Sequence, residues 1–114
     1  MKDIGNYVDQ VFDAFENLPE VKIYFTHGHL ADGNIHFLVG KSNGTTELIK
    51  KVNDIVYGPL KHLEGTVSAE HGIGVHKKEY LQLSRSTEEI ELMRLLKVSL
   101  NSRGILNRGK IIDA

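Results

Sequence analysis

Residues 21–40 have the sequence VKIYFTHGHLADGNIHFLVG, in which two runs of alternating apolar and polar residues flank an Asp-Gly turn. The apolar positions are Val21, Ile23, Phe25, Ile35, Phe37 and Val39. Alternation with a period of two is typical of strands that bury one face and leave the other in water. The sequence therefore predicts two antiparallel, half-buried strands joined by a long connection that bears histidines.

The segments around this pair have helical and extended patterns in turn. Helices are expected at residues 4–15, at 45–63 with a kink or early end at Pro59, from about residue 76, and at 86–104, with a further short strand at 65–69. The last helix begins with a capping-box signature, Ser86 followed three residues later by Glu89. This order predicts a single α+β domain over residues 1–114, with helices packed on one face of an antiparallel sheet.

Composition and charge narrow the possible functions. The formal net charge is −1, from 14 basic and 15 acidic residues, which argues against a protein that binds nucleic acid. No apolar run approaches the ~20 residues that cross a bilayer, and the first ten residues have no signal-peptide core, so we expect a cytoplasmic protein without a transmembrane segment. The chain has no cysteine, so any metal site must use His, Asp and Glu side chains.

The segment from Thr26 to Phe37 holds three of the six histidines of the chain. If the first strand runs on straight, His27 and His29 share one face of it, because they are two residues apart. If the chain turns at Asp32-Gly33, His29 and His36 can instead converge across the turn. Neutral imidazoles of this kind bind borderline cations such as zinc, manganese or cobalt. The alternative is that these histidines are polar strand-end residues whose nitrogens are satisfied by backbone carbonyls.

A second cluster lies in the stretch SAEHGIGVHKK, where Glu70 and His71 precede two glycines. Glu70 could supply a third, anionic ligand, and His71 could act as a general base beside a metal-bound oxygen. The alternative is a turn with an incidental acid and base. The basic residues that could bind an anionic substrate or a phosphate are Lys77, Lys78, Arg103, Arg108 and Lys110, although most basic side chains are simply solvated.

Three ordered motifs, GHLADGNIH, SAEHGIGVHK and GILNRGKI, resemble the C-terminal portion of the FAD-linked oxidases. This group includes a glycolate oxidase, D-lactate dehydrogenases and D-2-hydroxyglutarate dehydrogenase, within the vanillyl-alcohol-oxidase superfamily. The resemblance covers roughly residues 24–112. It implies part of a ferredoxin-like cap domain that works with FAD on 2-hydroxyacids.

The resemblance also implies roles for individual residues. A divalent metal, zinc or manganese, would be held by His29, His36 and Glu70 and would bind the carboxylate and α-hydroxyl of the substrate. His71 would take the hydroxyl proton while a hydride passes to the flavin. The residues implied near substrate or flavin are Asn34, Lys77, Asn107 and Lys110. The closing motif departs from the family pattern at Asn101-Ser102 and Arg108 but keeps the asparagine and lysine. His27, beside the first motif, could compete for the metal.

Members of the family carry a much larger N-terminal FAD-binding domain. The chain is therefore expected to be a C-terminal fragment, inactive alone, whose FAD is bound mainly by an absent domain or by a flavin subunit. Two alternatives stay open. The chain could be a non-redox metal-binding module that activates water, or an interaction module that forms a homodimer or pairs with a flavin subunit.

Overall fold

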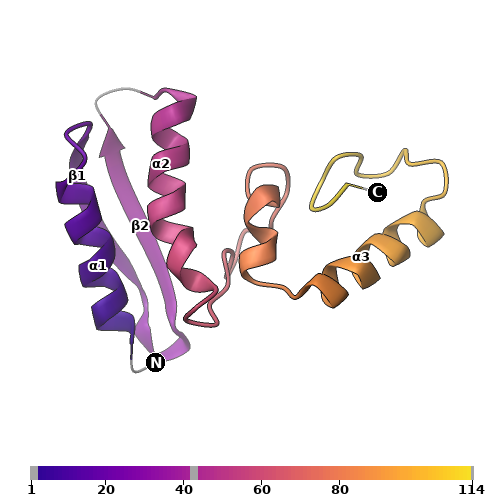
Figure 1. Ribbon diagram of the computed structural model, residues 1–114, viewed down its shortest axis with the longest axis horizontal. Helices are drawn as coiled ribbons and strands as arrows, with labels where there is room; N and C mark the ends of the chain where they lie inside the picture. Colours follow the sequence, from indigo (N-terminus) through magenta and orange to yellow (C-terminus); the bar gives the residue numbers. More distant parts are fainter. Residues whose placement is uncertain (1–2, 42–43, 114) are drawn as a thin grey trace. The chain divides into compact units, whose positions relative to one another are not determined.

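The computed structural model describes residues 3–41 and 44–113, and these form two compact units, Met1–Pro59 and Leu60–Ala114. We call them the first and the second unit (Figure 1). The first unit contains helix α1 (Ile4–Glu16), strand β1 (Val21–His29), the 3-10 turn η1 (Leu30–Asp32), strand β2 (Asn34–Lys41) and helix α2 (Thr46–Tyr57), and the 3-10 turn η2 (Gly58–Leu60) spans the boundary between the two units in the sequence. Strands β1 and β2 pair antiparallel, which confirms the predicted α+β class.

The core of the first unit lies between α1 and the strands. Phe15 of α1 is 0% exposed, and its ring packs 5.5 Å from the ring of Tyr24 on β1 and 6.5 Å from that of Phe37 on β2. Near the start of the same helix, the hydroxyl of Tyr7 donates a hydrogen bond to the carbonyl of Val56 in α2. Aromatic packing therefore holds α1 to the strand pair, and the Tyr7 hydrogen bond joins α2 to α1.

The strand pair differs from the prediction in which face it buries. Val21 is buried, but Ile23 is 66% and Phe25 53% exposed, and Tyr24 contacts α1 instead. The register shifts between Val21 and Ile23, because a bulge there sets two residues of β1 against one of β2. A bulge reverses the alternation of the residues beyond it. The expectation that Ile23 and Phe25 share the buried face of Val21 was therefore wrong.

The connection between the strands is also shorter than expected. Strand β1 continues through His29 and β2 begins at Asn34, so only residues 30–33 join them. Gly33 has a φ of +67°, a backbone conformation that glycine adopts without the steric cost a side chain would bring. The histidines predicted to lie in a loop consequently belong to the strands, and their positions are fixed by strand register.

Tyr7 gives the first unit a dependence on alkaline pH. Burial, with a smaller effect of Tyr57, raises the pKa of Tyr7 to about 12. Between the usual pKa of tyrosine, ~10, and this raised pKa, the phenol of Tyr7 is neutral in the folded state but ionised in the unfolded chain, and ionisation therefore favours unfolding. The contribution of Tyr7 to the unfolding free energy is complete below pH ~10 and is lost as the pH rises through 12. Between these two pH values the unfolding free energy of the Tyr7→Phe variant should therefore fall by roughly 2–3 kcal/mol less than that of the wild type.

Urea unfolding followed by circular dichroism at several pH values between 9 and 12 would check this expectation. The variant also lacks the bond to the carbonyl of Val56, so it should start about 1 kcal/mol less stable at pH 9. Ionisation of the lysines and other tyrosines is common to both proteins and cancels in the comparison. If the unfolding free energies of the two proteins fell in parallel with rising pH, the raised pKa of Tyr7 would be contradicted.

The second unit contains the 3-10 helix η3 (Lys78–Leu83) and helix α3 (Thr87–Leu100). The capping box is confirmed: Ser86 Oγ accepts from the amide of Glu89, and the carboxylate of Glu89 accepts from the amide of Ser86. The buried apolar side chains of the second unit are Val67, Tyr80, Leu81 and Ile112. No helix in the described parts of either unit is long and apolar enough to cross a membrane.

The strand predicted at residues 65–69 does not form. The amide of Val67 donates to Ser84 Oγ at 2.8 Å instead of to a neighbouring strand, and the side chain of Val67 is buried in the second unit. A strand requires a partner for its backbone groups, and here a serine side chain supplies the hydrogen bond. The segment is irregular as it enters the Glu70-His71 motif.

Candidate functional site

The strand register brings three histidines onto one face of the β1–β2 pair. His27 lies opposite His36, and His29 lies opposite Asn34. Side chains that are directly opposite, or two apart on one strand, share a face of a sheet. His27, His29 and His36 are therefore on the same face, and it is the face turned away from α1, because Tyr24 and Phe37 occupy the other one.

Within this face, His36 has a closer neighbour than the predicted one. The rings of His27 and His36 are stacked with centroids 5.0 Å apart and planes inclined by 8°. His29 stands diagonal to His36, one step further along the pair. The backbone at His36 is fixed in addition by Thr26, whose hydroxyl donates to the carbonyl of His36 at 2.9 Å. The face thus presents imidazoles on a hydrogen-bonded framework.

The Glu70-His71 motif lies in a loop of the second unit. His71 Nε2 is 4.0 Å from Glu70 Oε2, and the side chains of His71 and Glu70 are 81% and 46% exposed. The loop is held across its base, since Ser68 Oγ donates to the carbonyl of Gly72 at 2.9 Å and Lys77 Nζ lies 3.4 Å from Ser68 Oγ. The predicted acid and base are therefore neighbours on an accessible loop, with Lys77 engaged in supporting it.

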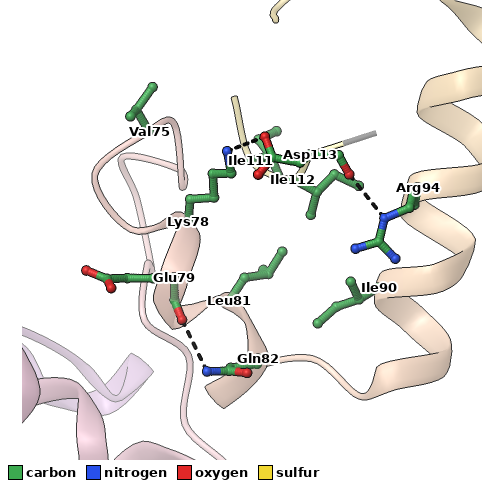
Figure 2. A pocket seen from close by; sticks show the side chains of 10 residues that line it. All are labelled: Val75, Lys78, Glu79, Leu81, Gln82, Ile90, Arg94, Ile111, Ile112 and Asp113. Carbon is green, nitrogen blue, oxygen red and sulfur yellow. Dashed lines mark hydrogen bonds and ion pairs between the residues drawn. The ribbon is translucent and has the colours of Figure 1, made fainter. Parts of the chain in front are cut away.

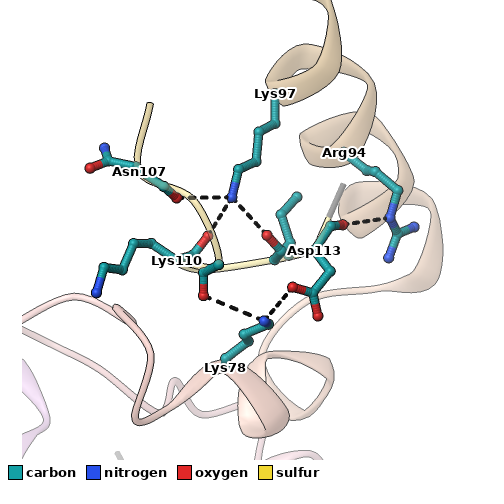
Figure 3. Close-up of polar contacts among 8 residues, drawn as sticks. Lys78, Arg94, Lys97, Asn107, Lys110 and Asp113 are labelled. Carbon is teal, nitrogen blue, oxygen red and sulfur yellow. Dashed lines mark hydrogen bonds and ion pairs between the residues drawn. The ribbon is translucent and has the colours of Figure 1, made fainter. Parts of the chain in front are cut away.

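The C-terminal tail packs against this loop and against α3. The amide of Ile111 donates to the carbonyl of Gly74 at 2.7 Å. From α3, Lys97 Nζ donates to the carbonyls of Lys110 and Ile112 at 2.7 Å each and to that of Asn107 at 3.4 Å (Figure 3). Asn107 and Lys110 are thus held through their backbones in the same unit as Glu70 and His71.

Sequence reasoning singled out Lys78 only as a possible anion-binding residue, and it missed the contacts that anchor the last part of this tail. Lys78 Nζ binds the carboxylate of Asp113, and Arg94 Nε donates to the Asp113 carbonyl at 3.1 Å. Together with apolar side chains of η3, α3 and the tail, these residues line an open pocket (Figure 2). The hydrogen bond from Lys78 holds the pKa of Asp113 below its usual range. Because Lys78 and Asp113 are 35 positions apart, no local spacing pattern signals the pair.

The predicted metal ligands are divided between the two units. His29 and His36 belong to the first unit and Glu70 to the second. Within residues 3–41 and 44–113, no three His, Asp or Glu side chains gather closely enough to hold a metal ion. The donor set itself, two imidazole nitrogens and a carboxylate oxygen, is one that borderline divalent cations accept. The three-residue site stays a prediction.

Comparison with known proteins gives a consistent result. Residues 1–111 match the family of C-terminal domains of FAD linked oxidases. The chain is 36% identical over 115 residues to the mitochondrial D-2-hydroxyglutarate dehydrogenase of Bos taurus, covering 96% of this chain and 21% of that protein. It is 38% identical over 104 residues to the D-2-hydroxyglutarate dehydrogenase of Stutzerimonas stutzeri (strain A1501), covering 87% and 22%.

A third relative, the D-2-hydroxyglutarate dehydrogenase of Xanthomonas citri pv. viticola, is 41% identical over 91 residues, which cover 75% of this chain and 19% of that protein. The chain thus spans about a fifth of the length of these relatives. No solved structure matches the chain significantly.

Proposed function

Since the chain belongs to the family of FAD-linked oxidase C-terminal domains, we propose that it is the substrate-binding and proton-accepting part of a flavin-dependent D-2-hydroxyacid dehydrogenase. The observation that carries the proposal is the exposed Glu70-His71 pair, whose imidazole and carboxylate are 4.0 Å apart in an accessible loop. The names of the relatives suggest D-2-hydroxyglutarate as the substrate. The cytoplasmic location expected from the sequence stays a prediction.

The residues present fit a divalent cation by their chemistry. His29 and His36 offer two nitrogens on one strand face, and Glu70 offers an exposed carboxylate. When bound, the cation would stabilise negative charge on the substrate oxygens and the flavin would accept a hydride. Asn34, opposite His29 in the register, would donate a hydrogen bond to the substrate from the same face.

The proton step belongs to His71. Oxidation of a 2-hydroxyacid to a 2-oxoacid removes the hydroxyl proton and the hydride of the α-carbon. His71 Nε2 would accept that proton, and the resulting imidazolium would be stabilised by the carboxylate of Glu70 beside it. Lys77 acts through Ser68 and keeps the loop in place.

Exposed apolar surface supports the proposal that a flavin-binding domain or subunit completes the protein. On α3 and the tail that follows, the leucines and isoleucine that are at least half exposed are Leu92, Leu95, Leu96, Leu100, Ile105 and Leu106. Apolar patches of this kind usually mark contact surfaces. We propose that the chain does not transfer a hydride by itself.

The test is a chimera in which this chain replaces the matching C-terminal segment of the Stutzerimonas stutzeri relative. Under anaerobic conditions D-2-hydroxyglutarate should bleach the visible flavin absorbance, and the L-isomer should not. Removal of divalent metal by a chelator should abolish the bleaching, and added zinc or manganese should restore it. A folded, flavin-loaded chimera that the substrate does not reduce would overturn the proposal. Hydrolytic activity of the chain alone with zinc would favour the metal-module alternative.

A further inference from the structure

The stacked pair of His27 and His36 has no part in the function proposed above beyond the single ligand His36. The two residues face each other across the antiparallel strands, with ring centroids 5.0 Å apart and planes 8° apart. Both lie in the first unit, so their arrangement is set by one short hairpin. The pair therefore brings two nitrogen donors together without any contribution from Glu70.

The spacing of the pair suits chelation of one ion. Directly opposed residues of an antiparallel pair have Cβ atoms about 4.5–5.5 Å apart. Two imidazoles bound to one cation with metal–nitrogen bonds of about 2.0–2.1 Å bring their nitrogens to roughly 3.3 Å in tetrahedral geometry. In the stacked arrangement the ring planes are nearly parallel, so the in-plane lone pairs of the two imidazoles do not meet at one point. The torsion about the Cβ–Cγ bond of histidine has a broad energy minimum, so rotation of both rings about this bond, well out of the stacked arrangement, directs one nitrogen of each ring toward a common ion.

The surroundings of the pair favour binding. Along the open face, Phe25 and Leu38 form the next pair on one side, and His29 with Asn34 forms the next pair on the other. Phe25 and Leu38 are both exposed, so this face is accessible to solvent, and an ion bound by the imidazoles would have apolar side chains on one side. Backbone pairing through β1 and β2 fixes both Cα positions before an ion arrives, which lowers the ordering cost of chelation.

We propose that His27 and His36 form a zinc-binding pair across the strands, with water in the remaining coordination positions. Borderline cations prefer imidazole nitrogen, whereas magnesium prefers oxygen ligands, so the pair should select zinc over magnesium. The inference goes beyond the proposed function, because it requires neither the flavin nor the second unit. His36 would be shared, so this pair and the three-residue set cannot be occupied together.

The test is calorimetric titration of the untagged, chelator-stripped chain with zinc chloride and, separately, with magnesium chloride. The expected result is one zinc per chain and no heat from magnesium. His27→Ala should weaken zinc binding by at least about tenfold, which corresponds to about 1.4 kcal/mol. Glu70→Ala should leave the affinity unchanged. His76→Ala, which removes an exposed histidine of the second unit, is the matched control and should also leave it unchanged.

His27 is exposed, so its replacement should leave the circular dichroism spectrum unchanged, and the comparison then reports binding alone. Equal affinity in the wild type and His27→Ala would overturn the inference. Loss of binding in Glu70→Ala to the same extent as in His27→Ala would overturn it as well and would favour the three-residue set. Absence of zinc binding would overturn the inference while leaving the proposed function, which is tested in the flavin-containing chimera, untouched.

Discussion

Gly28→Ala is expected to disrupt the strand pair that carries the histidines. Gly28 has a φ of +155°, and a Cβ atom at this position would lie 2.1 Å from the carbonyl oxygen of Asn34 and 3.0 Å from the Cα of Ile35. These are backbone atoms of the partner strand, so they cannot yield without breaking the pairing. We expect a loss of about 3 kcal/mol or more, a large part of the stability of a small domain.

Urea unfolding followed by circular dichroism would measure this loss. Gly40→Ala is the matched control, because Gly40 belongs to the same strand pair and a Cβ there would meet Ile23 at an ordinary 3.5 Å. The control should cost well under 1 kcal/mol, as substitutions without a clash usually do. Zinc binding should also fail in Gly28→Ala, since His27 and His29 flank the glycine. Equal stability of the two variants would contradict the assigned clash.

The sequence predicted the elements of the first unit better than their faces. Alternation located β1 and β2, and helical spacing located α1 and α2, because each pattern follows from the periodicity of its own element. The bulge after Val21 left no trace in the pattern, since apolar residues continue at every second position on the exposed side. Ile23 and Phe25 consequently looked like core residues.

The same reasoning explains what was predicted about the site. Histidine and glutamate stand out by type, so His29, His36, Glu70 and His71 are candidate site residues on the sequence alone, and their roles stay predictions. The pairing of His36 with His27 was not predicted. It depends on the strand register, which is set by the short connection of residues 30–33. In the second unit, the contacts of Lys97 with the tail involve backbone carbonyls, which every residue has, so no sequence signal could indicate them.

His71→Ala is expected to reduce the rate of flavin reduction in the chimera by about 10²–10⁴-fold, the usual contribution of a positioned general base. The side chain of His71 is 81% exposed, so its removal should not destabilise the fold or prevent flavin loading. Binding of substrate should change little, because the proton is transferred only in the chemical step. The loss should therefore appear in kcat and leave KM nearly unchanged.

Stopped-flow measurement of flavin reduction with saturating D-2-hydroxyglutarate would check the rate, with His76→Ala as the control from the same region of the second unit. Because the loop is accessible, free imidazole in the buffer should reach the space left by the side chain and restore part of the rate in His71→Ala. A histidine that only supported the loop would not be replaced by imidazole in solution. A variant that reduces flavin at the wild-type rate would show that the hydroxyl proton goes to another group, and Glu70 would then be the next residue to replace, because its carboxylate is the neighbour of His71.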